Sequence, residues 1–382
     1  MNAVPAPLSP SRRSTWLRVL VVIALLYLFL SGVKALEAGI KSLGSGFTDS
    51  LFEGVSNPIA GLFVGILATV LVQSSSVSTS TIVGLVGAGT LTVPLAVPMI
   101  MGANIGTTVT NTLASLGYLR RSAEFKRAFA GATMHDFFNL LAVAVLLPLE
   151  LATKFLSRTA TELSELLRGA GTPGVEQPDS PVKAVVKVLT DLVERVLEAV
   201  GAGDTVAGIV LLAVGLAAIF VALAFITRTM RALLIDRIER SINAILERGA
   251  GVPAMALGVV MTVAVQSSSI TTSVLVPLIA AGLLTLRNAY PVTLGANLGT
   301  TVTALLASLA TDRPEGLAIA LTHTLFNLSG ILLFYPVPWL RHLPVRMAER
   351  LAGLAEVRKS LVLVYVIGGF VVIPLLGVLA LR

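Results

Sequence analysis

The chain has 382 residues, of which 55% are hydrophobic and 13% charged, and its mean hydropathy is +0.89. Soluble domains carry about a quarter charged residues, so this composition excludes an ordinary soluble protein. The sequence has no cysteine, which excludes disulfides and thiolate metal sites. The net charge of +7 does not indicate a nucleic-acid partner, because the basic residues lie between apolar runs, where they orient membrane helices.

The first elements predict a tail, a spanning helix and a hairpin. Residues 1–15 hold prolines and arginines and are typical of a disordered cytoplasmic tail. Residues 16–36 form the first expected spanning helix, and the Gly-rich stretch 37–57 is expected along the membrane interface. Residues 58–72 and 77–89 are each too short to cross. Because a polar Gln-Ser-Ser-Ser run joins them, they predict a re-entrant hairpin.

The next elements complete the first half, 16–151. Residues 91–116 are long enough to cross, but Gly-Ala-Asn-Ile-Gly at 102–106 predicts a broken helix. Residues 118–127 are basic and therefore predicted to be cytoplasmic. Residues 128–151 cross next.

The rest of the chain follows the same plan after a polar segment. Residues 152–204 have balanced charges and predict an external linker. The second half, 205–340, is followed at 341–382 by a basic amphipathic segment and a last spanning helix. Within the second half we expect a crossing at 205–227, a cytoplasmic amphipathic segment at 228–249, a hairpin at 251–282, a broken helix at 284–310 and a crossing at 316–340.

An internal duplication relates the two halves. Residues 73–116 match 266–309 without a gap at 26 of 44 positions. The elements above amount to seven crossings and two hairpins, with an odd number of crossings between corresponding parts of the halves. The predicted fold is thus an all-α membrane protein with two inverted-topology repeats, each with a re-entrant hairpin and a broken transmembrane helix.

The duplicated stretch is uncharged but polar. Residues 57–111 contain no Lys, Arg, Asp, Glu or His, and 251–303 contain only Arg287, yet both are dense in Ser, Thr, Asn and Gln. Such groups are costly in hydrocarbon unless paired. They could join helices together, but a doubled serine run between half-helices favours a small-ion site. Hydroxyls, amides and helix N-termini suit an oxyanion, and hydroxyl, carbonyl and amide oxygens suit sodium. Without a fixed positive charge at the tips, a carried anion needs accompanying cations.

These motifs resemble those of a known family. The paired Gln-Ser-Ser-Ser runs, each followed by Gly-Ala-Asn-(Ile/Leu)-Gly-Thr-Thr, and the run from Arg127 to Asn139 are similar to the type II sodium–phosphate cotransporters. The resemblance implies sodium-driven symport of inorganic phosphate, in its divalent form, across the plasma (inner) membrane with the N-terminus cytoplasmic. It implies no cofactor and no enzymatic activity. Sodium, phosphate and the lipid bilayer are the expected partners, and the sequence does not fix the oligomeric state.

The resemblance also implies residue roles. The phosphate site would contain Ser74, Ser75, Ser76, Ser267, Ser268, Ser269, Asn104 and Asn297. The sodium sites would contain Gln73, Gln266, Thr300, Thr303, Asp136 and Asn139. The pattern Ala-x-Ala-x-x-x-Asp at 130–136 is that of electrogenic members, which implies three sodium ions per divalent phosphate.

Several of these residues have a second interpretation. Asp136 is a functional candidate because an intramembrane carboxylate is costly, but it could instead partner His135 or Asn139. His135 and His323 occupy matching positions and are expected to be structural hydrogen-bonding groups. Asn139 and Asn327 could either fix the broken helices or touch sodium.

Three other functions are weighed against symport. An intramembrane serine hydrolase is disfavoured because the chain has no Gly-x-Ser-x-Gly elbow and the triple serine is doubled. An ion channel, or a transporter for another small oxyanion, would also use polar hairpins.

Overall fold

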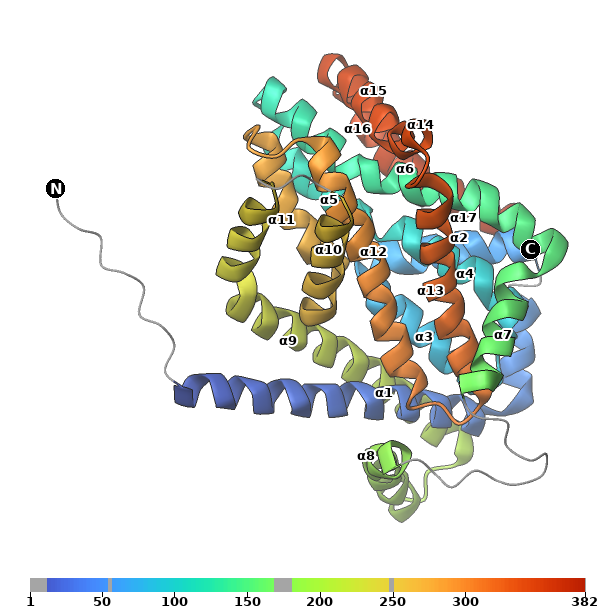
Figure 1. Ribbon diagram of the computed structural model, residues 1–382. Coiled ribbons are helices and arrows are strands. Elements are labelled where there is room, and N and C mark those ends of the chain that lie inside the picture. Colours follow the sequence, from blue (N-terminus) through green and yellow to red (C-terminus); the bar gives the residue numbers. More distant parts are fainter. Residues whose placement is uncertain (1–11, 54–56, 168–180, 247–250, 382) are drawn as a thin grey trace.

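The computed structural model describes residues 12–53, 57–167, 181–246 and 251–381, and every element within them is helical (Figure 1). The predicted tail at 1–15 lies outside the described residues except for its last four, which are already helical. The helices of the first half are α1 (Arg12–Glu53), α2 (Pro58–Val72), α3 (Ser75–Gly87), α4 (Val93–Gly106), α5 (Val109–Ser115), the 3-10 turn η1 (Leu116–Tyr118) and α6 (Ser122–Thr153).

The remaining helices fall into a connecting pair, a second half and a C-terminal group. The connecting pair is α7 (Phe155–Leu167) and α8 (Pro181–Ala199). The second half contains α9 (Asp204–Leu246), α10 (Val252–Val265), α11 (Ser268–Ala280), α12 (Leu286–Ser308) and α13 (Pro314–Phe334). The C-terminal group contains α14 (Pro338–Arg341), α15 (Leu343–Val357), α16 (Ser360–Leu363), the π-helix η2 (Val364–Val372) and α17 (Ile373–Ala380).

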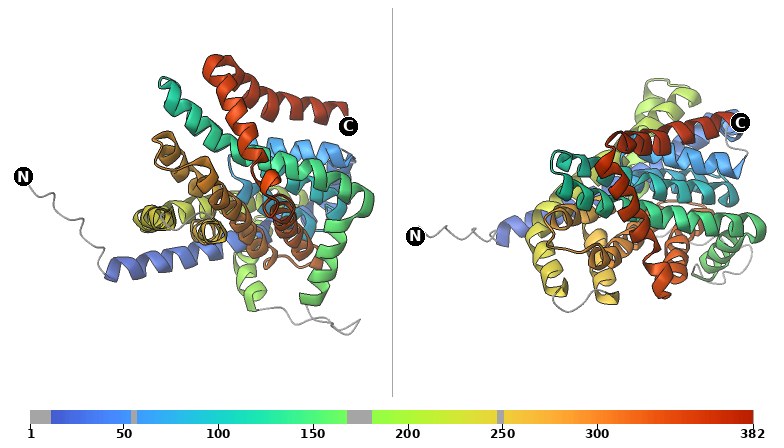
Figure 2. Two further views of the ribbon diagram at one scale, coloured as in Figure 1. Left: turned by 45° about the horizontal axis from the view of Figure 1, so that its top comes forward. Right: turned by 90° about the horizontal axis from the view of Figure 1, so that it is seen from above.

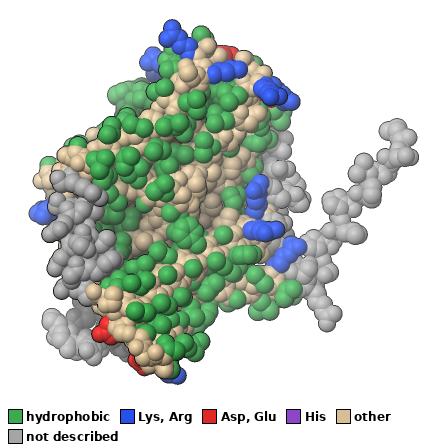
Figure 3. Space-filling model, turned by 180° about the vertical axis from the view of Figure 1, so that it is seen from behind, with side chains coloured by type: hydrophobic (Ala, Val, Ile, Leu, Met, Phe, Trp, Pro, Cys, Tyr) green, Lys and Arg blue, Asp and Glu red, His purple; other side chains and the backbone are tan. Residues whose placement is uncertain are grey.

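Six helical segments of the described chain are long and apolar enough to cross a membrane. They are Trp16–Leu43, Val93–Tyr118, Ser122–Thr153, Asp204–Arg231, Pro314–Phe334 and Ser360–Ala380. Hydrophobic side chains cover much of the face in Figure 3, and Lys and Arg lie mainly around its margin, at the upper end and along the right side. The protein is therefore an all-helical membrane protein. The seventh predicted crossing, α12, has 23 residues and is long enough to cross. Its Ser, Thr, Asn and Gly residues make it less apolar than the six segments above.

The long helices α1 and α9 lie against each other through glycines. A Cβ added at Gly32 or Gly39 would meet the backbone of Gly215 or Gly208 on α9. Helix α1 continues to Glu53, so residues 37–53 of the stretch expected along the membrane interface are helical. Small residues at such crossings are a usual device of membrane helices, because they let the backbones approach.

The same device joins α2 to α4 and α10 to α12. A Cβ at Gly102 would collide with the carbonyl oxygen of Leu62, and one at Gly295 with that of Met255. Likewise, a Cβ at Gly65 of α2 would collide with the carbonyl oxygen of Met99 on α4, and one at Gly258 of α10 with that of Val292 on α12. The corresponding pairs of the two halves therefore pack alike.

One of the two predicted broken helices is wrong. In the first half residues 102–106, where the break is predicted, are helical, and the interruption lies just after them at Thr107–Thr108, whereas α12 runs without a break from Leu286 to Ser308. The two stretches share Gly-Ala-Asn-x-Gly-Thr-Thr, so those residues do not cause the break. The first difference after the shared Val-Thr is Asn111, which donates to the Thr272 hydroxyl of α11, where the second half has Ala304.

The predicted linker at 152–204 is largely helical, because α7 and α8 occupy most of its described part. Helix α7 docks on α13, where the Ser164 hydroxyl donates to the carbonyl of Pro314 at 3.2 Å. Burying its apolar stripe there makes α7 part of the helical body.

Contacts between distant segments define the two ends of the bundle. At one end, the Lys359 ammonium donates to the carbonyl of Leu119 at 2.7 Å, and Lys126 pairs with Glu356 at 2.9 Å. Arg127 joins this end by donating to the carbonyl of Ala280 at 2.8 Å. Figure 2 shows α15 beside the start of α6 there. The segment 118–127, predicted to be cytoplasmic, and the basic segment 341–359 are thus at the same end.

At the other end, ion pairs connect α1 to the turn between α12 and α13. Lys34, which is almost fully buried, pairs with Asp312 at 2.5 Å, and Lys41 pairs with Asp312 at 3.1 Å. The buried Glu37 lies 2.8 Å from Lys41. Burial raises the pKa of Asp312, but hydrogen bonds and charges from the two lysines outweigh it and hold that pKa well below its usual range.

Candidate functional site

The site is built from two tips, one in each half, with the same local structure. Gln73 ends α2 and Gln266 ends α10 in the left-handed backbone region, each with φ 55°. The following serine then begins the next helix. Ser74 accepts from the backbone N–H of Val77, and Ser267 accepts from that of Ile270. Non-glycine residues in this backbone region cost about 1 kcal/mol or more, and such strain clusters at functional sites.

The side chains of the two glutamines are held in the same way. Each amide nitrogen donates back to its own helix, to Val70 in the first half and to Val263 in the second. Each amide oxygen accepts from a threonine hydroxyl, from Thr110 at 3.1 Å and from Thr303 at 2.9 Å. Thr110 and Thr303 are 193 residues apart, as are the glutamines, so both pairs belong to the duplication.

The two tips are in contact. The hydroxyl of Ser76 donates to the carbonyl of Gln266 at 3.2 Å, and Ser75, Ser76 and Ser268 are buried. Helices α3 and α11 both begin at this point. The first N–H groups of a helix have no partner within it and carry partial positive charge. The tips therefore bring together serine hydroxyls and two helix N-termini, a combination suited to an oxyanion.

The two tips differ in exposure. Gln73 is exposed and Thr110 is half-buried, whereas Gln266 is 7% exposed and Thr303 is fully buried. The same hydrogen-bonded pair is thus open in the first half and closed in the second.

Four asparagines connect the halves beside a histidine. The amide nitrogen of Asn297 donates to the side-chain oxygens of Asn139 at 2.8 Å and Asn327 at 2.6 Å. Asn327 donates to the Asn104 side chain at 3.3 Å, and Asn139 donates to the Asn104 carbonyl at 2.8 Å. His323 Nε2 lies 3.3 Å from the Asn104 oxygen. Among the described residues, no hydrogen bond joins this cluster to the serine runs.

Asp136 lies fully buried on α6. Its Oδ2 accepts from the Tyr365 hydroxyl at 2.8 Å and from the Thr112 hydroxyl at 3.4 Å. Its Oδ1 has no hydrogen-bond partner among the described residues. A buried carboxylate with one free oxygen can accept a cation. His135, the preceding residue, is also buried, and neither ring nitrogen has a hydrogen-bond partner in the described part of the chain.

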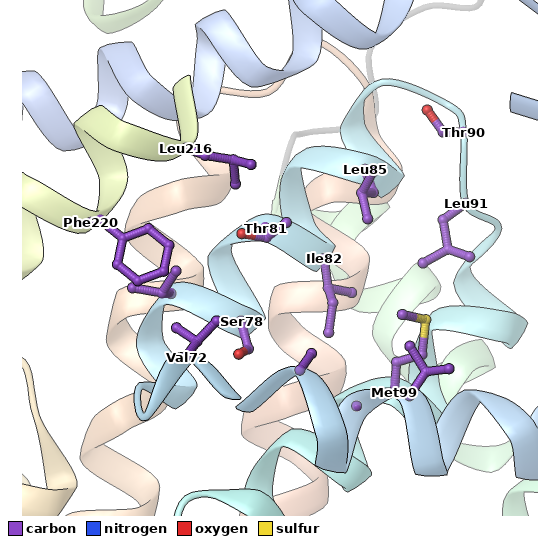
Figure 4. Close-up of a pocket in the computed structure, with 14 residues that line it drawn as sticks. Val72, Ser78, Thr81, Ile82, Leu85, Thr90, Leu91, Met99, Leu216 and Phe220 are labelled. Atoms are coloured by element: carbon purple, nitrogen blue, oxygen red, sulfur yellow. The ribbon is translucent and has the colours of Figure 1, made fainter. Parts of the chain in front are cut away.

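A separate apolar cavity of about 380 Å³ lies between the first hairpin and α9. Figure 4 shows Ser78, Ile82 and Leu85 of α3 facing Leu216 and Phe220 of α9 across it. Its lining is almost wholly apolar, so it does not suit an ion.

A comparison with protein families covers most of these residues. Residues 28–171 and 218–335 match the Na+/Pi-cotransporter family, and these ranges include both tips, the asparagine cluster and Asp136. The chain belongs to the Na+/Pi-cotransporter family. The second range ends at residue 335, so the last spanning helix lies outside the matched residues.

Curated relatives extend the similarity to the Na+/Pi-cotransporters of animals. The chain is 36% identical to the sodium-dependent phosphate transport protein 2A of Ovis aries, covering 94% of this chain and 67% of the relative. It is 34% identical to the sodium-dependent phosphate transport protein 2B of Homo sapiens, covering 94% and 64%. No solved structure matches the chain.

The predicted site residues do not all lie together in the structure. Gln73, Gln266 and Thr303 lie at the tips with the six serines, whereas the Thr300 hydroxyl donates to the carbonyl of Ala296 in its own helix. The predicted site residues Asn104, Asn297 and Asn139 lie in the asparagine cluster, and Asp136 is bound by Tyr365. Their predicted ion contacts stay predictions.

Three residues of these arrangements were missed by sequence reasoning. Thr110 could have been found, because it is the repeat partner of Thr303. Thr112 and Tyr365 carry no such signal. Thr112 has Leu305 at the matching position, and Tyr365 lies in an apolar helix outside the duplication.

Proposed function

We propose that this protein is a secondary active symporter that couples sodium influx to the uptake of divalent inorganic phosphate. The observation that carries the proposal is the contact between two duplicated tips, each with a serine run at a helix N-terminus and a glutamine–threonine pair. The named functions of the curated relatives support the same substrates.

The tips favour symport over a basic anion pore. The duplicated windows contain one cation, Arg287, which begins α12 far along the helix from Thr303. Divalent phosphate bound there needs compensating positive charge, since an uncompensated ion is costly at membrane depth. Co-bound sodium supplies that charge, with hydroxyl and amide oxygens as ligands. Loss of sodium on the other side would then promote phosphate release.

In the proposed assignment, the six serines, Asn104 and Asn297 bind phosphate. Gln73, Gln266, Thr300, Thr303 and Asn139 serve sodium. Asp136 takes an additional sodium through its free Oδ1, which makes transport electrogenic.

The proposed topology is two inverted repeats whose hairpins enter from opposite sides. Two sets of contacts support it. The turn after α3 has Gly89 beside Arg313, close to the Lys34–Asp312 end. The turn after α11 has Gly282 beside Arg127, at the opposite, basic end. In Figure 1 the turn from α12 to α13 and the turn from α11 to α12 lie at opposite ends of the bundle. Inverted repeats of this kind alternate access by exchanging conformations.

The proposed location is the plasma (inner) membrane, with the N-terminus and the basic end cytoplasmic by the positive-inside rule. The protein acts without a cofactor and without enzymatic activity.

Reconstituted proteoliposomes test the proposal. We expect radiolabelled phosphate to accumulate with an inward sodium gradient and to saturate with sodium, and we expect little uptake with a potassium gradient of the same size. Equal uptake with potassium would contradict sodium coupling. Non-saturating phosphate flux without accumulation would instead identify a channel, and accumulation of a different oxyanion in preference to phosphate would reassign the substrate.

A further inference from the structure

The last spanning helix contributes one side chain to the interior of the bundle at Asp136. Tyr365 is 229 residues from Asp136 in sequence, and its hydroxyl donates to Asp136 Oδ2 at 2.8 Å. This helix lies outside the two family-matched ranges and outside the duplication. The contact therefore comes from a part of the chain that neither repeat provides.

The backbone around Tyr365 is π-helical. Residues Val364–Val372 form a π-helix between α16 and α17. A π-helical turn is rare, costs hydrogen-bond geometry, and occurs frequently at functional sites, where it redirects a side chain.

The ring of Tyr365 is held by three aromatic neighbours. Its centroid lies 6.2 Å from that of Phe129 and 6.4 Å from that of Phe137, both on α6. It lies 5.6 Å from Phe370 within its own helix. Because Phe129 and Phe137 flank Asp136 on α6, this packing directs the hydroxyl at the carboxylate.

The hydrogen bonds leave the carboxylate asymmetric. Oδ2 accepts from Tyr365 and Thr112, whereas the buried Oδ1 accepts from no described residue. Thr108 also approaches the carboxylate, but its hydroxyl donates to the carbonyl of Ile105 at 2.7 Å. With Oδ2 restrained, rotation of the carboxyl group is restricted and Oδ1 keeps a fixed direction.

We propose that Tyr365 is a positioning residue for the sodium ion bound at Asp136. It restrains Oδ2 so that Oδ1 is ready for the ion, and it thereby makes the last helix part of the sodium site. This inference rests on the proposed function. The positioning role is assigned to the hydroxyl of Tyr365 alone, because the ring by itself only packs against its neighbours.

Tyr365→Phe tests the hydroxyl while keeping the ring. Without the restraint, sodium binding must also order the carboxylate, so the sodium concentration for half-maximal phosphate uptake should rise about threefold to tenfold, the size expected for the net contribution of one hydrogen bond. The phosphate concentration for half-maximal uptake, measured at saturating sodium, should stay unchanged. A merely structural role would lower the maximal rate without this split.

A binding measurement provides a second readout without transport. Sodium should raise the melting temperature of the detergent-purified protein, and Tyr365→Phe should move the midpoint of that effect to higher sodium by a similar factor. In the Asp136→Asn background the same substitution should add no further shift, because the hydroxyl acts through the carboxylate.

A control variant separates the hydroxyl of Tyr365 from the loss of any tyrosine hydroxyl. Tyr27→Phe removes a hydroxyl from a side chain that is 37% exposed on α1, and it should not change the sodium midpoint.

Two results would overturn the assignment of Tyr365: an unchanged sodium midpoint in Tyr365→Phe, or the same shift in the Asp136→Asn background. The proposed function would fail differently, because the unaltered protein would then show no sodium-dependent phosphate uptake.

Discussion

At the scale of single residues, we propose that Asp136 determines the charge carried with each phosphate. Three sodium ions with divalent phosphate would carry about one net positive charge, and each such charge gains about 2.3 kcal/mol from 100 mV. We predict that Asp136→Asn removes one sodium and leaves transport electroneutral. Uptake by the unaltered protein should accelerate when valinomycin and potassium make the vesicle interior negative, and uptake by the variant should not.

The charge moved per phosphate decides between these outcomes. It is obtained by recording the transport current and the uptake of radiolabelled phosphate on the same vesicles. Thr133→Val, on a buried threonine of α6 whose hydroxyl donates to the carbonyl of Phe129, is the matched control and should keep the charge per phosphate. An unchanged charge per phosphate in Asp136→Asn would reject the role assigned to the carboxylate.

At the scale of helices, the glycine contacts set how closely α2 and α4 approach. We predict that Gly102→Ala destabilises the protein by about 1–3 kcal/mol or more, because its Cβ would collide with the backbone of Leu62, which cannot move aside as a side chain can. The melting temperature of the detergent-purified protein, together with the yield of monodisperse material, measures the effect.

Gly117→Ala is the control for this prediction, since a Cβ at Gly117 meets no atom within 4 Å. It should leave the melting temperature nearly unchanged. If both variants melt alike, the glycines are not needed for helix packing, and the crossing geometry of α2 and α4 must be held by other side chains.

The helices also show what the sequence could predict. Both tips were predictable, because the duplication marks Gln73 and Gln266 and the apolar runs on either side are too short to cross. The continuity of α12 was not predictable from its glycines, because Gly295 and Gly299 serve close packing and leave the helix intact. The length of α1 was not predictable either, because the helix continues through the Gly-rich stretch to Glu53.

The same distinction holds within the candidate site. Sequence reasoning identified side chains that recur in both halves, such as Gln266 with Thr303. It missed Tyr365, because an isolated tyrosine in an apolar helix is also typical of packing, and only the tertiary contact with Asp136 gives it a partner.

At the scale of the whole molecule, the two halves hold the same local structure in different surroundings. The pair Gln73–Thr110 is open, and the pair Gln266–Thr303 is closed. Polar groups of this kind would not face hydrocarbon, so we infer that the open pair lines a water-filled space. If the halves exchange these conformations, transport would open the second pair and close the first.

Because the chain contains no cysteine, single cysteines can report this exchange without background. We predict that a membrane-impermeant maleimide modifies Thr110→Cys readily in the absence of phosphate. It should modify Thr303→Cys at least about tenfold more slowly, since the state that opens the second half would be a minor population. Sodium with phosphate should accelerate labelling of Thr303→Cys and slow that of Thr110→Cys, each tested in vesicles whose phosphate uptake is measured in parallel. Equal labelling of both cysteines in every condition would mean that both pairs are open together, which is the behaviour of a channel and not of alternating access.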